Sequence, residues 1–120
     1  MPFDWKEYLA LAGFVSNQHG SGFSDEATKR CAISRAYYAA YCHARNHAHA
    51  KLGYIMLRSG QDHRGVREHY QSKGMNVIAN KLGTLNQWRN NADYDEELID
   101  NPNLLASTFS YATHIVSTLK

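Results

Sequence analysis

The stretch SDEATKRCAISRAYYAAYCHARNHAHAKL, residues 24–52, decides the fold of this chain. It holds neither proline nor glycine, so nothing in it interrupts a helix of about 28 residues. Ser24 or Asp25 is suited to cap its start, and Glu26 follows in the first turn, where the helix dipole favours an acidic side chain. Apolar or small side chains recur on two sides of it. The sequence therefore predicts one long central helix, covered on both flanks by neighbouring helices or by a second copy of the chain.

Four shorter helices are predicted around this one. Apolar side chains at three-and-four spacing predict a helix near residues 3–16, which ends at the loop SNQHGSG. Asp62 could cap a short helix that stops before Gly74. A clearer stripe runs from Met75 to about Ala92, and Asn101 followed by Pro102 is a start signal for a last helix with its stripe over 105–119. No segment is typical of a strand, a repeat or a linker, so we expect an all-α fold, an antiparallel four-to-five-helix bundle in a single domain over 1–120.

Length and composition agree with one cytoplasmic domain. The chain has 120 residues, of which 43% are hydrophobic, enough for one modest core. Its start, MPFDWKEY, places charges where a signal peptide needs apolar residues, and its apolar runs are too short for a membrane span. Cys31 and Cys42 are about 16 Å apart if one helix holds both, so they cannot pair, and we expect two small buried free thiols in a reducing compartment.

The net charge of +2 hides a strong asymmetry along the chain. Residues 29–89 contain eleven Lys and Arg against Asp62 and Glu68, while the segments 1–28 and 90–120 are acidic. A basic segment in a small helical protein indicates an anionic partner such as RNA, a nucleotide or an acidic protein surface. The alternative is that acidic terminal helices pack beside basic central ones and neutralise them.

Arg89 is the strongest local anomaly. It lies on the otherwise apolar stripe of Ile78, Leu82, Leu85 and Ala92. A guanidinium there must be paired, extend outward to solvent, or lie at a cleft where it binds an anion. Asp93 or Asp95 is close enough in sequence to pair with it, and that salt bridge is the structural alternative to anion binding.

Two segments resemble the paired signatures of HEPN domains, small all-helical bacterial and archaeal domains. They are SRAYYAAYCHARNHA at 34–48 and LNQWRNNADYD at 85–95, and the resemblance extends to the opening FDWKEYLALA. It implies a four-to-five-helix bundle, dimeric through the helices that carry the motifs. It also implies a partner protein, either a nucleotidyltransferase or the antitoxin of a two-gene defence module.

The active members of this family cleave RNA without metal, through an Arg followed after four to six positions by a His. The Arg matches Arg89, and the polar residue that usually follows it matches Asn90. The His has no match, because Tyr94 stands five positions after Arg89 and no His occurs between 90 and 113. A tyrosine, with an ordinary pKa of about 10, is a poor general base at neutral pH. Arg89, Asn90 and Tyr94 nevertheless suit phosphate binding, and Tyr94 would be the catalytic partner of Arg89 if the protein were active.

The polar face of the long helix supplies further candidates. Arg35, Tyr38 and Arg45 are expected to approach the cleft of Arg89 and Tyr94. Tyrosines at helical spacing such as Tyr37, Tyr38 and Tyr41 could stack on bases, although such residues are more often core. Arg64 and His69 have the family's spacing but stand on the short helix, where a solvated basic face is the simpler interpretation.

No cofactor or native metal site is predicted. His43 and His47 are an i, i+4 pair that could hold zinc from one helix face, but a third ligand at a diagnostic spacing is lacking. GSG at 20–22 has neither the lysine nor the context of a phosphate loop.

Three functions stay open at this point. The first is a HEPN-like module that binds RNA or a nucleotide, commonly as partner of a nucleotidyltransferase. The second is an active metal-independent ribonuclease toxin. The third is a structural domain that serves only protein interaction. The Tyr94 substitution favours the binding module, and a homodimer is expected in each case because the long helix has more apolar surface than one flank needs.

Overall fold

Five α-helices make up the fold, with no strand in residues 3–20 and 22–120, the part of the chain that the computed structural model describes. They are α1 (Trp5–Ser16), α2 (Asp25–Lys51), α3 (Asp62–Ser72), α4 (Asn76–Tyr94) and α5 (Leu104–Thr118). The prediction of an all-α fold is confirmed. The hydroxyl of Ser24 accepts from the amide of Ala27 at 3.0 Å, so this residue caps α2 as expected.

Two predicted helix starts are wrong. Pro102 is not the first residue of the last helix, because Asn101–Leu104 form a turn in which the Asn101 carbonyl accepts from the Leu104 amide at 3.1 Å. α5 therefore begins two residues later than expected, at Leu104. Asp62 does not cap α3 either. It is the first residue of that helix, and its carboxylate accepts from backbone amides of the preceding loop instead.

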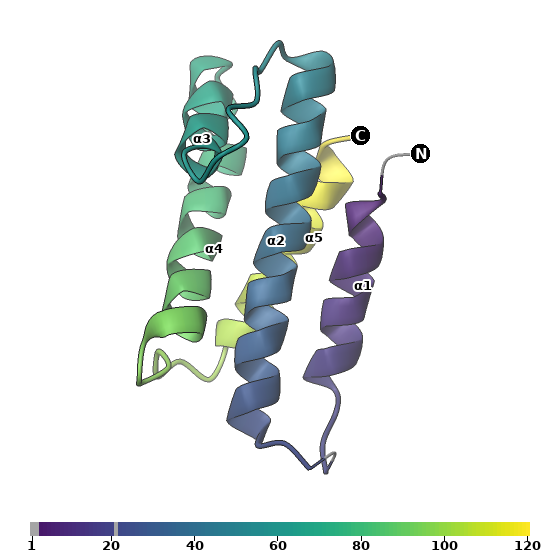
Figure 1. The fold of residues 1–120 in the computed structure, drawn as a ribbon, viewed down its shortest axis with the longest axis vertical. Helices are drawn as coiled ribbons and strands as arrows, with labels where there is room; N and C mark the ends of the chain where they lie inside the picture. The colour runs from purple at the N-terminus through teal and green to yellow at the C-terminus, as the bar shows by residue number, and fades with distance from the viewer. Residues whose placement is uncertain (1–2, 21) are drawn as a thin grey trace.

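The long helices run alternately up and down, as an antiparallel bundle requires (Figure 1). α1 descends beside α2, α2 ascends through the centre, α4 descends on its other side, and α5 ascends behind. The short α3 lies against the upper part of α4. α2 packs against all four other helices, which places its polar and aromatic side chains between neighbours on several sides.

The core is built mainly of alanine and tyrosine on α2. Buried alanines at 36, 40, 44 and 48 allow the neighbouring helices to approach closely, and Tyr37 and Tyr70 are almost wholly buried beside Leu82 and Leu85. The chain's own helices therefore cover most of the apolar residues of α2, from Ala32 to Ala48. The apolar surplus of α2 is explained within one chain and no longer argues for a dimer.

The two thiols differ from expectation in one respect. Both are free, but only Cys42 is buried. Cys31 is exposed, and it lines an apolar groove with Val15, Phe23, Ala27 and Thr28. Among the described helices, none combines the length and the apolar character needed to cross a membrane.

Candidate anion-binding site

Arg89 lies in the second-last turn of α4, with its guanidinium among tyrosine rings. Its residue exposure is 8%. The guanidinium carbon lies 5.2 Å from the ring centroid of Tyr37, 5.3 Å from that of Tyr38 and 6.0 Å from that of Tyr94. The faces of aromatic rings attract a cation, so these contacts compensate part of the cost of burying the charge. The apolar stripe of α4 thus carries a cation into an aromatic environment formed mostly by α2.

The polar contacts of Arg89 use only part of its donors. One terminal nitrogen, Nη2, donates to Oδ1 of Asn86 at 3.0 Å, and Nη1 lies 3.7 Å from Oδ2 of Asp93. Nε is buried and has no acceptor among the described residues. The hydroxyl of Ser34 donates to the same Asp93 oxygen at 3.2 Å. The predicted salt bridge therefore forms with Asp93 at a long distance, and one buried N–H remains available to an acceptor.

His63, at the start of α3, is the member of this site that sequence reasoning missed. Its Nδ1 lies 2.5 Å from the hydroxyl oxygen of Tyr37. Its ring stacks on Tyr41, with centroids 4.1 Å apart and planes 15° apart. Burial, and then the positive charges of Arg89 and Arg67, lower the pKa of His63. The imidazole is therefore neutral at neutral pH, because burial and the surrounding cations both disfavour its protonated form.

Tyr37 and Tyr41 remain protonated in this environment. Burial raises the pKa of Tyr37 far above its usual value, and burial together with the charge of Asp62 raises the pKa of Tyr41 to about 12. The Tyr37 hydroxyl is thus a hydrogen-bonding group and not a base. We call Tyr37, Tyr38, His63, Arg89 and Tyr94 the Arg89 site.

Two further arginines flank the Arg89 site. Nη1 of Arg67 on α3 donates to the backbone carbonyl of His63 at 3.1 Å. The guanidinium carbon of Arg45 on α2 lies 5.8 Å from the ring centroid of Tyr41, on which His63 stacks. Three helices therefore each direct one arginine toward the surroundings of His63.

The turn before α3 holds His63 in place through the neighbouring Asp62. The buried carboxylate of Asp62 accepts from the Tyr54 hydroxyl at 2.6 Å and from the amides of Leu57 and Arg58 at 2.8 Å each. Burial acts to raise the pKa of Asp62, but these hydrogen bonds outweigh it and the pKa is lowered. Gly65 is required here, because a Cβ at that position would lie 2.6 Å from the Tyr54 hydroxyl oxygen. The position of His63 thus depends on a rigid turn.

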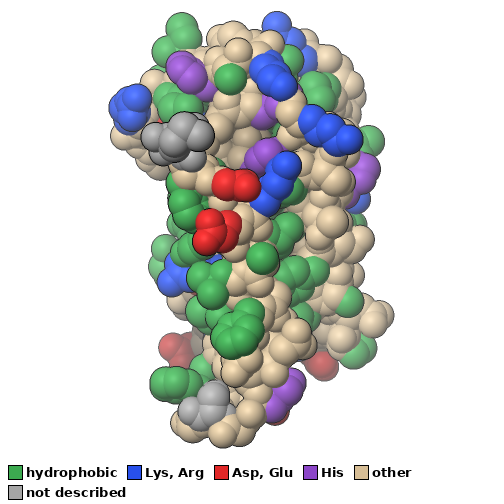
Figure 2. Space-filling model, turned by 90° about the vertical axis from the view of Figure 1, so that its right-hand side faces the viewer, with side chains coloured by type: hydrophobic (Ala, Val, Ile, Leu, Met, Phe, Trp, Pro, Cys, Tyr) green, Lys and Arg blue, Asp and Glu red, His purple; other side chains and the backbone are tan. Residues whose placement is uncertain are grey.

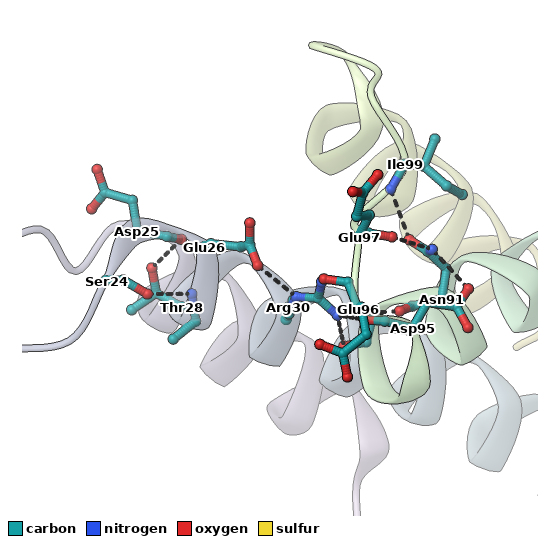
Figure 3. Close-up of polar contacts among 12 residues, drawn as sticks. Ser24, Asp25, Glu26, Thr28, Arg30, Asn91, Asp95, Glu96, Glu97 and Ile99 are labelled. Atoms are coloured by element: carbon teal, nitrogen blue, oxygen red, sulfur yellow. Dashed lines mark hydrogen bonds and ion pairs between the residues drawn. The ribbon is translucent and has the colours of Figure 1, made fainter.

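Arg30 on α2 holds the other end of the site (Figure 3). Its Nη1 donates to the carbonyls of Ala92 at 3.0 Å and Asp95 at 2.7 Å, and its Nη2 donates to that of Glu96 at 2.9 Å. Its Nε pairs with Glu26 at 3.1 Å. The last carbonyls of a helix have no partner within the helix, so a cation that donates hydrogen bonds to carbonyls at this position stabilises the end of α4. The segment that contains Asp93 and Tyr94 is therefore fixed against α2.

The structure brings together only some of the residues predicted from the sequence. Arg89, Tyr38 and Tyr94 are neighbours, and Tyr94 is 74% exposed. Arg45 lies nearby, over Tyr41. Arg35 instead lies over the ring of Tyr8 on α1, 5.8 Å from its centroid. Asn90 is exposed on the surface of α4.

The other histidine candidates lie apart from Arg89. Arg64 pairs with Glu68, and Nε2 of His69 is 2.6 Å from the carbonyl oxygen of Leu52. Nε2 of His43 is 2.5 Å from the carbonyl oxygen of Leu119. Across the described residues no three His, Cys, Asp or Glu side chains are grouped so that they could hold a metal ion.

Comparisons with protein-family models, curated proteins and solved structures found no match to this chain.

Proposed function

We propose that this protein is a HEPN-like module that binds the phosphate groups of RNA or of a nucleotide at the Arg89 site. The observation that supports this proposal is the buried Nε of Arg89, which has no acceptor among residues 3–20 and 22–120, while the carboxylate of Asp93 stays 3.7 Å from Nη1. An unpaired buried donor costs free energy, and a phosphate oxygen would satisfy it. The exposed ring of Tyr94, with its centroid 6.0 Å from the guanidinium carbon, would lie beside a phosphate bound there.

The charges around His63 favour an anion in the same place. Arg45, Arg67 and Arg89 all act to lower the pKa of His63, and Asp62 is the carboxylate that acts against them. A bound phosphate would offset these positive charges and would favour the protonated imidazole, which adds a second donor. Affinity should weaken as salt increases, because phosphate binding releases counterions from the nucleic acid.

The test is binding of a labelled single-stranded RNA, and of a nucleoside monophosphate, to the protein and two variants. Arg89→Met removes the guanidinium at similar volume, and Arg35→Met is the matched control because Arg35 contacts Tyr8 and not the Arg89 site. We expect salt-sensitive binding that Arg89→Met abolishes and Arg35→Met retains. Equal loss in both variants, or no binding by the parent at low salt, would contradict the proposal.

The second candidate function is metal-independent cleavage of RNA, favoured by the contact between Tyr37 and His63. When Nδ1–H donates to the Tyr37 oxygen, Nε2 carries the lone pair of a base. Nε2 can then take the proton of a ribose 2′-hydroxyl as its oxygen attacks the adjacent phosphorus. The bond from phosphorus to the 5′-oxygen breaks, the imidazolium returns the proton to that oxygen, and Arg89 offsets charge on the phosphoryl oxygens. The products are a cyclic phosphate and a 5′-hydroxyl.

Cleavage of single-stranded RNA in the presence of EDTA tests this second function. We expect His63→Gln and Tyr37→Phe to lower any activity of the parent, and His114→Gln to leave it unchanged because His114 is exposed on α5. If the parent binds RNA without cutting it, the binding function stands and the cleavage function fails.

We also propose that the protein forms a homodimer, with a nucleotidyltransferase or an antitoxin as the further protein partner that the HEPN resemblance implies. Hydrophobic side chains gather on the face that includes α1 (Figure 2), where Leu11, Phe14 and Phe23 are between 49% and 72% exposed. Light scattering should give twice the chain mass.

Two variants distinguish the possible interfaces. If the face that includes α1 is the interface, the double substitution Phe14→Ser and Phe23→Ser should yield the monomer. If α2 and α4 of the two copies form the interface, Tyr94→Ser should yield the monomer. A monomeric parent at micromolar concentration would contradict the dimer.

A further inference from the structure

We infer that the groove between α3 and α4 binds the neighbouring nucleotides of a single-stranded RNA whose phosphate occupies the Arg89 site. This inference rests on the proposed function. The groove has a volume of about 510 Å³. Most of its lining can bond to phosphates, riboses or bases, through Arg64, Arg67, Gln71, Asn80, Thr84 and Gln87.

Arg67 joins the groove to the Arg89 site. It lines the groove, and its Nη1 also donates to the carbonyl of His63, whose ring belongs to the Arg89 site. Its positive charge contributes to the lowered pKa of His63 and acts against the rise that burial causes in the pKa of Tyr37, as expected for a cation near both groups. A chain of phosphates leaving Arg89 past His63 would therefore meet Arg67 next.

Gly83 keeps the groove open on the side of α4. A glycine inside a helix costs about 1 kcal/mol relative to alanine, so its presence needs a local reason. A Cβ at position 83 would lie 3.6 Å from Cδ of Arg67, which is an ordinary van der Waals contact. A longer side chain at that position would collide with the side chain of Arg67. Because Gly83 has no side chain, the side chain of Arg67 can lie against α4 at this position.

Glu68 limits the present charge of the groove. Its carboxylate oxygen is 2.5 Å from Nε of Arg64, and both side chains are mostly exposed. The pair is thus easily exchanged for a contact between Arg64 and a phosphate, because exposed ion pairs contribute little stability.

The inference predicts that a short oligouridylate binds more tightly than uridine monophosphate, and that changes in the groove affect only the oligonucleotide. Gly83→Leu should lower the affinity for the oligouridylate about tenfold and leave that for the monophosphate unchanged. Gly83→Ala, which fits the observed contact, is the control and should retain both affinities. Glu68→Gln should raise the affinity for the oligouridylate, a gain that a folding defect cannot produce.

The outcomes separate this inference from the proposed function. If the parent binds both probes with equal affinity, or if Glu68→Gln and Gly83→Leu leave the oligouridylate affinity unchanged, the groove does not bind RNA although the Arg89 site still binds phosphate. If Gly83→Leu weakens both probes equally, the groove is not a separate subsite. If the parent binds neither probe, or if Arg89→Met retains both affinities, the proposed function itself fails.

Discussion

The hydroxyl oxygen of Tyr37 and Nδ1 of His63 lie 2.5 Å apart, although the two residues are 26 positions apart in the chain. This contact joins the central helix α2 to the start of α3. It also places a neutral imidazole beside Arg89, whose guanidinium lies over the same tyrosine ring. The Arg89 site therefore contains a group able to move a proton, even though Tyr94 occupies the position where the HEPN resemblance expects a histidine.

Arg89→Met should separate binding from stability. A buried, incompletely paired guanidinium contributes little net stability, and a well-packed apolar side chain of similar volume often replaces such a group without loss. We expect the free energy of unfolding, measured in urea, to stay within about 1 kcal/mol of the parent or to rise. Asp93 is partly exposed, so the carboxylate left behind can be hydrated. A loss of several kcal/mol would instead identify Arg89 as a structural element.

Tyr94→His tests whether the expected histidine position is functional. Tyr94 is 74% exposed, so the substitution should change stability by no more than about 0.5 kcal/mol. Its ring centroid is 6.0 Å from the guanidinium carbon of Arg89, close enough for a histidine to meet a phosphate held there. We expect metal-independent cleavage of RNA to increase about tenfold or more, toward the range of positioned acid–base catalysis. Tyr94→Asn is the control, and no difference between the two variants would contradict the prediction.

Arg30→Ala should destabilise the end of α4. The variant loses the donors to the carbonyls of Ala92, Asp95 and Glu96, and hydrogen bonds to a charged group are the stronger kind. We expect the free energy of unfolding to fall by about 2 kcal/mol in urea denaturation. Arg30→Lys keeps the charge but not the planar fork, so it should recover only part of the loss. The neighbouring Lys29→Ala is the matched control, and an equal effect at both positions would mean that charge alone matters.

His63 should make the protein less stable as the pH falls below about 6.5. Its pKa is lower in the folded state than in the unfolded chain, so the unfolded chain binds the proton first and gains stability from it. The contribution of neutral His63 to the free energy of unfolding is complete above the pKa that His63 has in the unfolded chain. It is lost as the pH falls toward the lower pKa of His63 in the folded state. The pKa of His47 is also lowered, through burial and the charge of Lys51, and contributes in the same direction. His63→Gln should therefore make the decrease between pH 7 and pH 5 shallower, without removing it.

Urea denaturation at several pH values measures this effect. His114→Gln serves as the control for the same substitution at an exposed position. An identical slope for the parent and His63→Gln would show that the folded state holds the imidazole without penalising its charge.

The sequence alone predicted the helices well because they depend on local features. Ser24 caps α2 through the amide of Ala27 as its position predicts, and the apolar stripe through Leu82 and Leu85 is buried. The errors at Asp62 and Pro102 lie at helix starts. There, a turn competes with the first turn of the helix, and the tertiary partners of the turn decide the outcome.

Part of the Arg89 site was also accessible from the sequence. Arg89 stands on an apolar stripe four positions before Asp93, and this spacing alone predicts a buried guanidinium with a carboxylate in reach. The proximity of Tyr94 follows from the same helix. The sequence could therefore predict the contacts that depend only on spacing within one helix.

The tertiary structure decided which groups from other helices join Arg89. His63 stacks on Tyr41 because the turn held by Asp62 starts α3 beside that residue of α2. Arg30 reaches the end of α4 because α2 and α4 run antiparallel, side by side. Arg35, although it shares α2 with Tyr38, lies over Tyr8 of α1 instead. The order of residues along the chain sets the neighbours within a helix, whereas the packing of buried side chains between helices sets the rest.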